Sequence, residues 1–378
     1  MPTGEAARDP GVVTGACTRP PDPGYYSRAV ITGQPRLRAE GTQPSQGARR
    51  PATVLVWLGG ALGDTLLGYP ALAALRTWAP DGRIVLVSRP AYAAFAATSG
   101  LVDQVVDSDG AMAGALFGGS SRPLEAPELA VIWSAAYREL SEQVQNMGAR
   151  VIIAAPPRPS DPRHQARYLL DCLRPLGVRR TLLPAPPPLL NAAPRAEQAL
   201  LGGHLGRTAL LHPGAGSAWK CWPLASWLIL AEALSARGLV VRWSFGPDDE
   251  RLRADLFVVA PEWRPATLPV LPLPRFADLL ARCGLFVSPD TGVAHLAALL
   301  QTPQITLFGP TDPRRWRPLS RKAVLAVAPN PHGCAWDNAE AGSDSPPALR
   351  RCKGPGGDVC ACLAALSPEA VLACYPRA

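Results

Sequence analysis

Lysine is scarce in this sequence. Of 38 basic residues only Lys220, Lys322 and Lys353 are lysines, so arginine carries nearly all of the formal net charge of +8. A basic balance attracts nucleic acid, anionic lipid headgroups or phosphorylated small molecules, and charge alone does not choose among them. The scarcity makes each lysine a position to consider separately.

Long apolar runs are also missing. No stretch approaches the roughly 20 apolar residues that span a bilayer, and the first ten residues lack a charged start followed by an apolar segment. We therefore expect a cytoplasmic protein. Nine cysteines in that compartment should be mostly reduced, which argues against a disulfide framework. The length of 378 residues, with 47% apolar, is enough for two soluble domains and a tail.

The chain divides into three regions. Residues 1–50 are rich in proline, glycine and arginine and show no apolar period, which predicts a disordered arm. Beyond it, short apolar runs alternate with helix-like segments in two series, separated by the proline-dense stretch 182–194. The predicted strands are 53–58, 83–88, 104–106, 129–133 and 151–155, then 208–212, 239–245, 285–288 and 304–308. This alternation predicts an α/β fold with two parallel-sheet domains, 51–190 and 191–378, whose ligands lie at the carboxyl ends of the strands.

A first glycine-rich loop, GGALGD, follows the first predicted strand and ends at Asp64. Gly60 and Gly63 allow a ligand to approach the backbone closely. The loop does not fit a P-loop or the G-x-G-x-x-G pattern. Asp64 opens a predicted helix over 64–78, which Pro70 must kink or begin. Its carboxylate either caps that helix or acts as a general base toward an acceptor hydroxyl.

A second loop, HPGAGSAWKCWP, follows the first strand of the second series. If it faces the cleft, the backbone around Gly214 and Gly216 and the hydroxyl of Ser217 would hold a phosphate. The ammonium of Lys220 would then neutralise charge on a departing diphosphate. The alternative is a surface turn with a solvated lysine, which the scarcity of lysine disfavours.

A third loop, SPDTGVAH, runs from a strand end into a helix start. Amides near Thr291 and Gly292 would form an anion site at the helix N-terminus. Asp290 or Thr291 would equally serve as an ordinary N-cap, and His295 is either a phosphate contact or a buried histidine. Asp249, in the loop GPDDE after another strand, would accept hydrogen bonds from a ribose or a base, or be a solvated loop acid.

Together these stretches resemble glycosyltransferase family 9, the ADP-heptose:lipopolysaccharide heptosyltransferases. The resemblance covers roughly residues 52–373 and rests on LVWLGGALGDTLLGYPAL, LLHPGAGSAWKCWPLASW, WSFGPDDE and FADLLARCGLFVSPDTGVAHLAALLQTPQITLFGPTDPRRW. It implies the GT-B architecture, two facing Rossmann-like domains. It also implies an inverting transfer of heptose from ADP-heptose, without a metal in the chemical step. Carried onto matching positions, Asp64 is the base, Lys220 contacts the diphosphate, and Asp290, Thr291, Gly292 and His295 lie at the donor.

The acceptor stays open at this point. A lipopolysaccharide-core sugar is the first expectation, and another glycan or a protein side chain, as in protein O-heptosyltransferases, are the alternatives. A lipid-linked acceptor would place the protein peripherally at the cytoplasmic face of the inner membrane, where basic residues would help it to dock.

Cysteines crowd the C-terminal region. The segment CLAALSPEAV at 362–371 resembles the closing segment of the family, and Cys334, Cys352, Cys360 and Cys362 precede or begin it. Clustered thiolates suit a structural zinc or iron ion, as in cysteine-bearing relatives that heptosylate secreted proteins. The missing C-x-x-C spacing argues against one.

Two other classes compete with a transferase. A dinucleotide-dependent enzyme needs an acid about 20 positions beyond the glycines, and Asp81 is near that distance but inside a turn. A basic nucleic-acid-binding protein ranks last, because the sequence has no recognised binding module and no aromatic-rich basic sheet.

Overall fold

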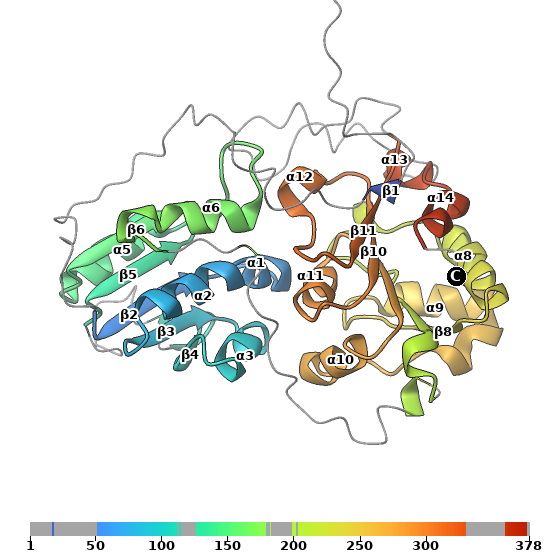
Figure 1. Ribbon diagram of the computed structural model, residues 1–378, viewed down its shortest axis with the longest axis horizontal. Helices are drawn as coiled ribbons and strands as arrows, with labels where there is room; N and C mark the ends of the chain where they lie inside the picture. Colours follow the sequence, from blue (N-terminus) through green and yellow to red (C-terminus); the bar gives the residue numbers. More distant parts are fainter. Residues whose placement is uncertain are drawn as a thin grey trace, which may run out of the picture.

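The computed structural model describes residues 17–18, 51–111, 113–114, 126–178, 182, 199–201, 203–329 and 360–375. Two α/β units lie side by side in it (Figure 1). We call residues 51–178 the first half and residues 199–375 the second half. This agrees with the predicted pair of parallel-sheet units; the proposed linker at 182–194 lies almost wholly outside the described residues.

The first half is built on a five-stranded parallel sheet in the order β4-β3-β2-β5-β6. Its strands are β2 (Thr53–Leu58), β3 (Arg83–Ser88), β4 (Gln104–Asp107), β5 (Leu129–Trp133) and β6 (Val151–Ala155). Its helices are α1 (Leu62–Leu67), α2 (Tyr69–Trp78), α3 (Pro90–Thr98), α5 (Tyr137–Asn146) and α6 (Gln165–Cys172). All five strands had been predicted, four of them with the bounds observed.

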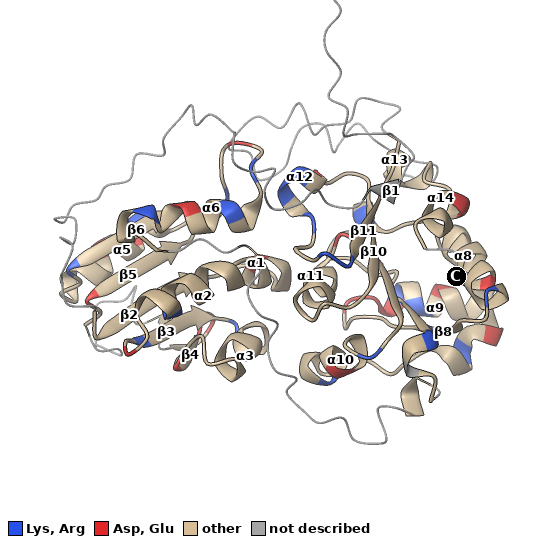
Figure 2. Cartoon of the chain, viewed as in Figure 1, with Lys and Arg blue, Asp and Glu red and all other residues tan. Residues whose placement is uncertain are grey.

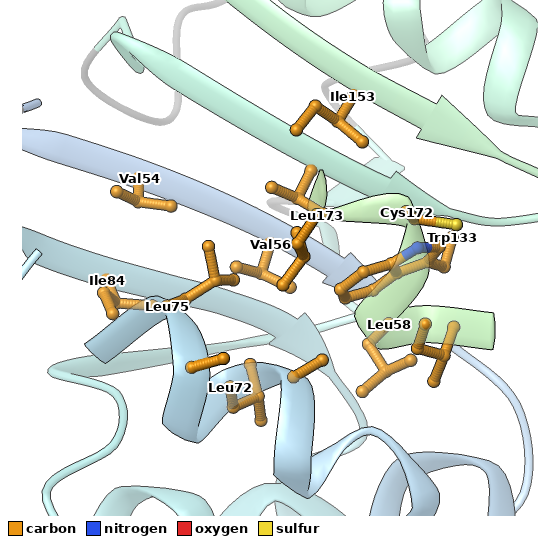
Figure 3. Close-up of a cluster of buried hydrophobic side chains, with 14 of the residues drawn as sticks. Val54, Val56, Leu58, Leu72, Leu75, Ile84, Trp133, Ile153, Cys172 and Leu173 are labelled. Carbon is orange, nitrogen blue, oxygen red and sulfur yellow. The ribbon is translucent and has the colours of Figure 1, made fainter. Parts of the chain in front are cut away.

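The core of this half explains why its strands read as continuous apolar runs. Val54, Val56 and Leu58 of β2 pack on one face of the sheet with Leu72 and Leu75 of α2 (Figure 3). A separate apolar cluster that includes Leu55 and Trp57 covers the other face. A central strand covered on both faces must be apolar at every position.

The predicted helix over 64–78 is divided into two. The amide of Gly68 donates to the carbonyls of Asp64 and Thr65, which ends α1, and Pro70 sits in the first turn of α2. Proline is tolerated there because the amide it lacks has no helical partner in the first turn. The break leaves α1 as a short helix that carries Asp64.

The second half has a six-stranded sheet in the order β1-β11-β10-β9-β7-β8. Its strands are β7 (Thr208–Leu211), β8 (Val240–Trp243), β9 (Leu285–Pro289), β10 (Gln304–Phe308) and β11 (Ala323–Val327), all parallel, and β1 (Cys17–Thr18), which is antiparallel to β11. Its helices are α8 (Leu224–Ala236), α9 (Glu250–Val259), α10 (Leu273–Leu280), α11 (Gly292–Leu299), α12 (Pro313–Trp316), α13 (Ala361–Ala364) and α14 (Pro368–Ala373).

Two strands of this sheet had not been predicted. One is β11, and the other is β1, which lies inside the predicted disordered arm and adds to the edge of the sheet through β11. A two-residue strand that pairs with a segment some 300 positions away leaves no periodic signal. The other residues of the arm lie outside the described part of the chain.

The halves meet through α1 and α11, which lie against each other at the boundary (Figure 1). An apolar cluster also joins Leu66 and Phe95 of the first half to Phe276, Phe286 and Leu296 of the second. This contact brings the carboxyl ends of both sheets toward one boundary, where ligands of such folds bind. Among the described residues, no helix is long and apolar enough to cross a bilayer.

Candidate active site

Asp64 occupies the third position of α1, close to the boundary between the halves. Its Oδ2 accepts a hydrogen bond of 3.1 Å from the amide of Ala61, so the predicted capping role is realised. The side chain is still 20% exposed, and Nη2 of Arg158 lies 4.0 Å from the same oxygen. Within the described residues, Oδ1 has no hydrogen-bond partner in the protein. Capping therefore leaves one carboxylate oxygen available for chemistry.

The glycine loop before α1 fits tightly around this carboxylate. Gly60 has a φ of 111°, which L side chains rarely adopt, and an added Cβ would lie 2.8 Å from Oδ2 of Asp64. The glycine is needed both for its backbone conformation and for the space that Asp64 fills.

Lys220 is placed by a short 3₁₀ helix over Ala218–Lys220 that follows β7. Its Nζ lies 3.5 Å from Oδ2 of Asp290, a buried carboxylate at the end of β9. Oδ1 of the same aspartate lies 3.8 Å from Nε2 of His295. Asp290 thus orients the predicted diphosphate-binding lysine, and about a quarter of the lysine side chain stays exposed. The lysine is therefore not a freely solvated surface residue.

His295 is buried, and burial lowers its pKa to about 4 against the opposing effect of Asp290. Within the described residues its Nδ1 is buried without a hydrogen-bond partner. The histidine is therefore neutral at pH 7. It is therefore buried, as one of the two predictions has it, but its hydrogen-bonding capacity is not satisfied by the described residues, and a contact with phosphate stays a prediction.

The start of α11 packs against α1 of the first half. Thr291 is the N-cap, and its side chain makes no capping hydrogen bond, so it occupies none of the amides at the start of α11. An added Cβ on Gly292 would lie 2.8 Å from Leu62 of α1, and one on Gly63 would lie 3.1 Å from the His295 ring. The structure thereby brings the Asp64 loop and the SPDTGVAH loop together.

A buried network supports the HPGAGS loop from beneath. Nδ1 of His212 lies 3.1 Å from Oγ of Ser244, and its Nε2 lies 3.8 Å from Oδ2 of Asp249. That oxygen also accepts a 2.7 Å hydrogen bond from the amide of Gly246. Burial lowers the pKa of His212 to about 4, although Asp249 opposes the shift. Asp249 is thus held by protein groups, and its contact with a ribose or base stays a prediction.

The two glycines of this loop have different surroundings. An added Cβ on buried Gly214 would lie 1.9 Å from the Asp249 carboxylate, whereas one on exposed Gly216 would meet nothing within 4 Å. Ser217 beside it is also exposed. The loop is therefore rigid at its base and open at its tip, where the predicted phosphate contacts lie.

Sequence reasoning missed three residues at this boundary: Arg158, His164 and Trp316. The guanidinium carbon of Arg158 lies 5.4 Å from the centroid of the Trp316 ring, which belongs to the opposite half. His164 contacts the carbonyl of Arg317 at 3.0 Å through Nε2. Arg158 and His164 follow the carboxyl end of β6, and that position was the available signal.

The predicted metal site is not assembled by the described residues. Cys334 and Cys352 lie outside them, and Cys360 and Cys362 are buried in the core of the second half. In the part of the chain that is described, no group of three His, Cys, Asp or Glu residues is placed to hold a metal ion. Cys374 is disulfide-bonded, an exception to the expectation of reduced cysteines.

The structure argues against the dinucleotide-dependent enzyme, because Asp81 is not placed to bind a ribose. Asp81 is exposed in the turn before β3. Because β3 runs parallel to β2, that turn lies at the opposite edge of the sheet from the glycine loop that follows β2. Asp81 is thus badly placed for a ribose bound at the glycines.

Comparisons with known proteins point to one family. Residues 190–339 match the family described as glycosyltransferase family 9 (heptosyltransferase). Lipopolysaccharide heptosyltransferase 1 of Pseudomonas aeruginosa is 44% identical over 100 residues, which are 26% of this chain and 28% of the relative. Lipopolysaccharide heptosyltransferase 3 of Escherichia coli is 33% identical over 166 residues, 41% of this chain and 47% of the relative. The chain thus spans less than half of the length of these curated relatives.

The fold extends the likeness over more of the chain. The structure of E. coli ADP-heptose lps heptosyltransferase II superposes with a TM-score of 0.59 at 17% identity, covering 85% of this chain and 96% of that one. This confirms the predicted GT-B architecture of two Rossmann-like units. The residues that match glycosyltransferase family 9 include the Lys220 and Asp290 loops described above, so the likeness in sequence lies on the second half.

Proposed function

We propose that this protein is an inverting glycosyltransferase that moves heptose from ADP-heptose to a hydroxyl of a lipopolysaccharide-core acceptor. The relatives named above are lipopolysaccharide heptosyltransferases, and the name of the structural neighbour specifies ADP-heptose. The first half would bind the acceptor and the second half the donor.

The reaction assigns a role to each side of the boundary. The acceptor oxygen attacks the anomeric carbon, the bond from that carbon to the diphosphate oxygen breaks, and Asp64 takes the hydroxyl proton. ADP leaves with the bonding electron pair, and Lys220 offsets the charge that develops on the diphosphate. Amides at the start of α11 and around Gly216 and Ser217 would hold the phosphates.

The observation that carries the proposal is the close approach of the two loops. Asp64 lies on a helix whose residue Leu62 packs against Gly292, at the start of the helix that follows Asp290. Asp290 in turn contacts Lys220. A carboxylate with one available oxygen therefore lies across the boundary from a lysine and a helix N-terminus, as an inverting displacement of a diphosphate requires.

The test is transfer to a defined acceptor. The purified protein is incubated with ADP-heptose and heptose-deficient lipopolysaccharide, and product is followed by mass spectrometry and ADP release. We expect the acceptor to gain one heptose, linked with the opposite anomeric configuration to the donor. Release of ADP without a glycosylated lipid, together with heptose on an added protein, would instead support the protein O-heptosyltransferase alternative.

We also propose that the protein docks peripherally on the cytoplasmic face of the inner membrane. Helices α6 and α12 both carry arginine, Arg167 in the first and Arg314 and Arg315 in the second, and their basic positions lie near the boundary between the halves (Figure 2). Anionic lipid attracts such residues within a Debye length of the surface. Sedimentation with anionic and with neutral vesicles at low salt tests this, and equal recovery with both would contradict it.

A further inference from the structure

A second contact between the halves lies beside the candidate active site. It joins the loop 156–164 of the first half to α12 of the second. The Nη2 atom of Arg315 donates to the carbonyl of Asp161 at 2.7 Å, and its Nη1 donates to the carbonyl of Pro159 at 3.4 Å. His164 contacts the carbonyl of Arg317 at 3.0 Å. Both neighbours of Trp316 in the sequence are therefore tied to the opposite half.

These ties hold the Trp316 ring against Arg158. The guanidinium carbon lies 5.4 Å from the ring centroid, within the range of a cation–π contact. The same guanidinium approaches Oδ2 of Asp64 to 4.0 Å. The three residues form a line from the second half to the carboxylate of the first: Trp316, Arg158, Asp64.

Arg158 needs the support of the Trp316 ring because its own side chain is 53% exposed. An exposed arginine beside a carboxylate samples many rotamers, and such a pair contributes little by itself. Stacking on an indole held by the other half restricts those rotamers. With Ala61 and Arg158 both directed at Oδ2, Oδ1 is the oxygen left for the proton of an acceptor hydroxyl.

We propose that Arg158 is a positioning residue for Asp64, and that Trp316 makes this positioning depend on contact between the halves. The inference rests on the proposed function, in which Asp64 is the base. Separation of the halves would remove the indole from Arg158 and leave the carboxylate without its second anchor. The base would then be fully oriented only when the donor half is in place.

The experiment measures kcat and KM for transfer from ADP-heptose to heptose-deficient lipopolysaccharide. The variants are Arg158→Ala, Trp316→Leu, the double variant, and Trp316→Phe, which keeps a ring face. Calorimetric titration with ADP checks the donor site in each. The matched control is Arg138→Ala, which removes a similar stack, 5.6 Å over Tyr137, that lies within one half.

We expect Arg158→Ala and Trp316→Leu each to lower kcat by about threefold to tenfold, with ADP affinity unchanged. The kcat of the double variant should equal that of Arg158→Ala, because Trp316 acts on Asp64 only through Arg158. Trp316→Phe and Arg138→Ala should stay close to the unaltered protein.

Two results would overturn the positioning role while leaving the proposed function intact. One is an unchanged kcat in Arg158→Ala, or a rise confined to the KM of the acceptor, which would make Arg158 an acceptor contact. The other is a double variant whose loss is the product of the two single losses. If the unaltered protein binds ADP but transfers no heptose, the proposed function fails, and this inference fails with it.

Discussion

The two halves have the same architecture but hold their candidate functional residues differently. In the second half, Lys220, Asp290 and His295 form one partly buried cluster, and His212 with Asp249 supports the neighbouring loop. In the first half, Asp64 is held by one backbone hydrogen bond and one half-exposed arginine. The family match lies over residues 190–339 and thus on the second half.

This difference follows from what each half is proposed to bind. A nucleotide diphosphate presents the same charges to every member of a family, so a rigid buried network can be built for it. Acceptors differ, and the first half need only keep one carboxylate oriented toward a hydroxyl. Variants that change ADP affinity without changing kcat, or kcat without ADP affinity, therefore test this difference between the halves directly.

The largest effect is expected from Asp64→Asn. If Asp64 is the proposed base, the substitution should lower kcat by about 10²–10⁴-fold, because an amide cannot take the hydroxyl proton. ADP affinity should not change, since the proposed donor site lies on the other half. Steady-state kinetics with calorimetry measures both, and Asp81→Asn, at an exposed acid of the same half, is the control. Equal losses of turnover and ADP affinity would contradict the assignment of the base to the first half and of donor binding to the second.

Acidification should destabilise the protein through three buried histidines: His164, His212 and His295. Burial lowers the pKa of each to about 4, so between pH 6.5 and 4 the unfolded chain binds more protons than the folded one. Stability is therefore full above pH 6.5 and falls as the pH drops, by up to about 1.4 kcal/mol per pH unit for each histidine. Urea unfolding at several pH values measures the slope.

His164→Asn sharpens this prediction for the boundary between the halves. Asparagine can replace the imidazole as the acceptor from the amide of Ala166, so the N-cap of α6 should survive. The slope of unfolding free energy against pH should then fall by about a third, since one of three titrating groups is gone. An unaltered slope would show that His164 does not titrate on unfolding.

A steric effect is expected from Gly214→Ala. Its Cβ would collide with the Asp249 carboxylate, so either the loop or the aspartate must move. Strain of this kind costs about 1–3 kcal/mol, and we expect ADP affinity to fall by about tenfold with a lower melting temperature. Gly216→Ala is the matched control, because its Cβ would enter open space. Equal behaviour of the two variants would argue against a rigid loop base.

The smallest effect is expected from Ser217→Ala. The residue is exposed at the tip of the loop, so its removal should leave the melting temperature unchanged. Loss of one neutral hydrogen bond to a phosphate should weaken ADP binding by about twofold to tenfold. Calorimetric titration with ADP measures it, and an unchanged affinity would remove Ser217 from the donor site.

Much of this organisation could be predicted from the sequence because it is local. Buried parallel strands such as β2 and β10 are continuous apolar runs, and the loops carrying Asp64, Lys220 and Asp290 follow strand ends directly. The resemblance then supplied their roles. Contacts formed between distant segments were missed, among them β1 on β11 and Arg158 on Trp316. The packing of the Asp249 carboxylate against Gly214 was missed as well, because a single acid in a predicted loop is expected to be solvated unless its neighbours are known.

The division of work between the halves is tested most directly by one calorimetric titration with ADP, run on the unaltered protein, Asp64→Asn and Lys220→Ala, with GDP, UDP and NAD as competitors for selectivity. We predict ADP-selective binding that Asp64→Asn leaves unchanged and Lys220→Ala weakens by about tenfold or more. Preference for NAD, or ADP binding that is indifferent to Lys220, would contradict a nucleotide-sugar site in the second half.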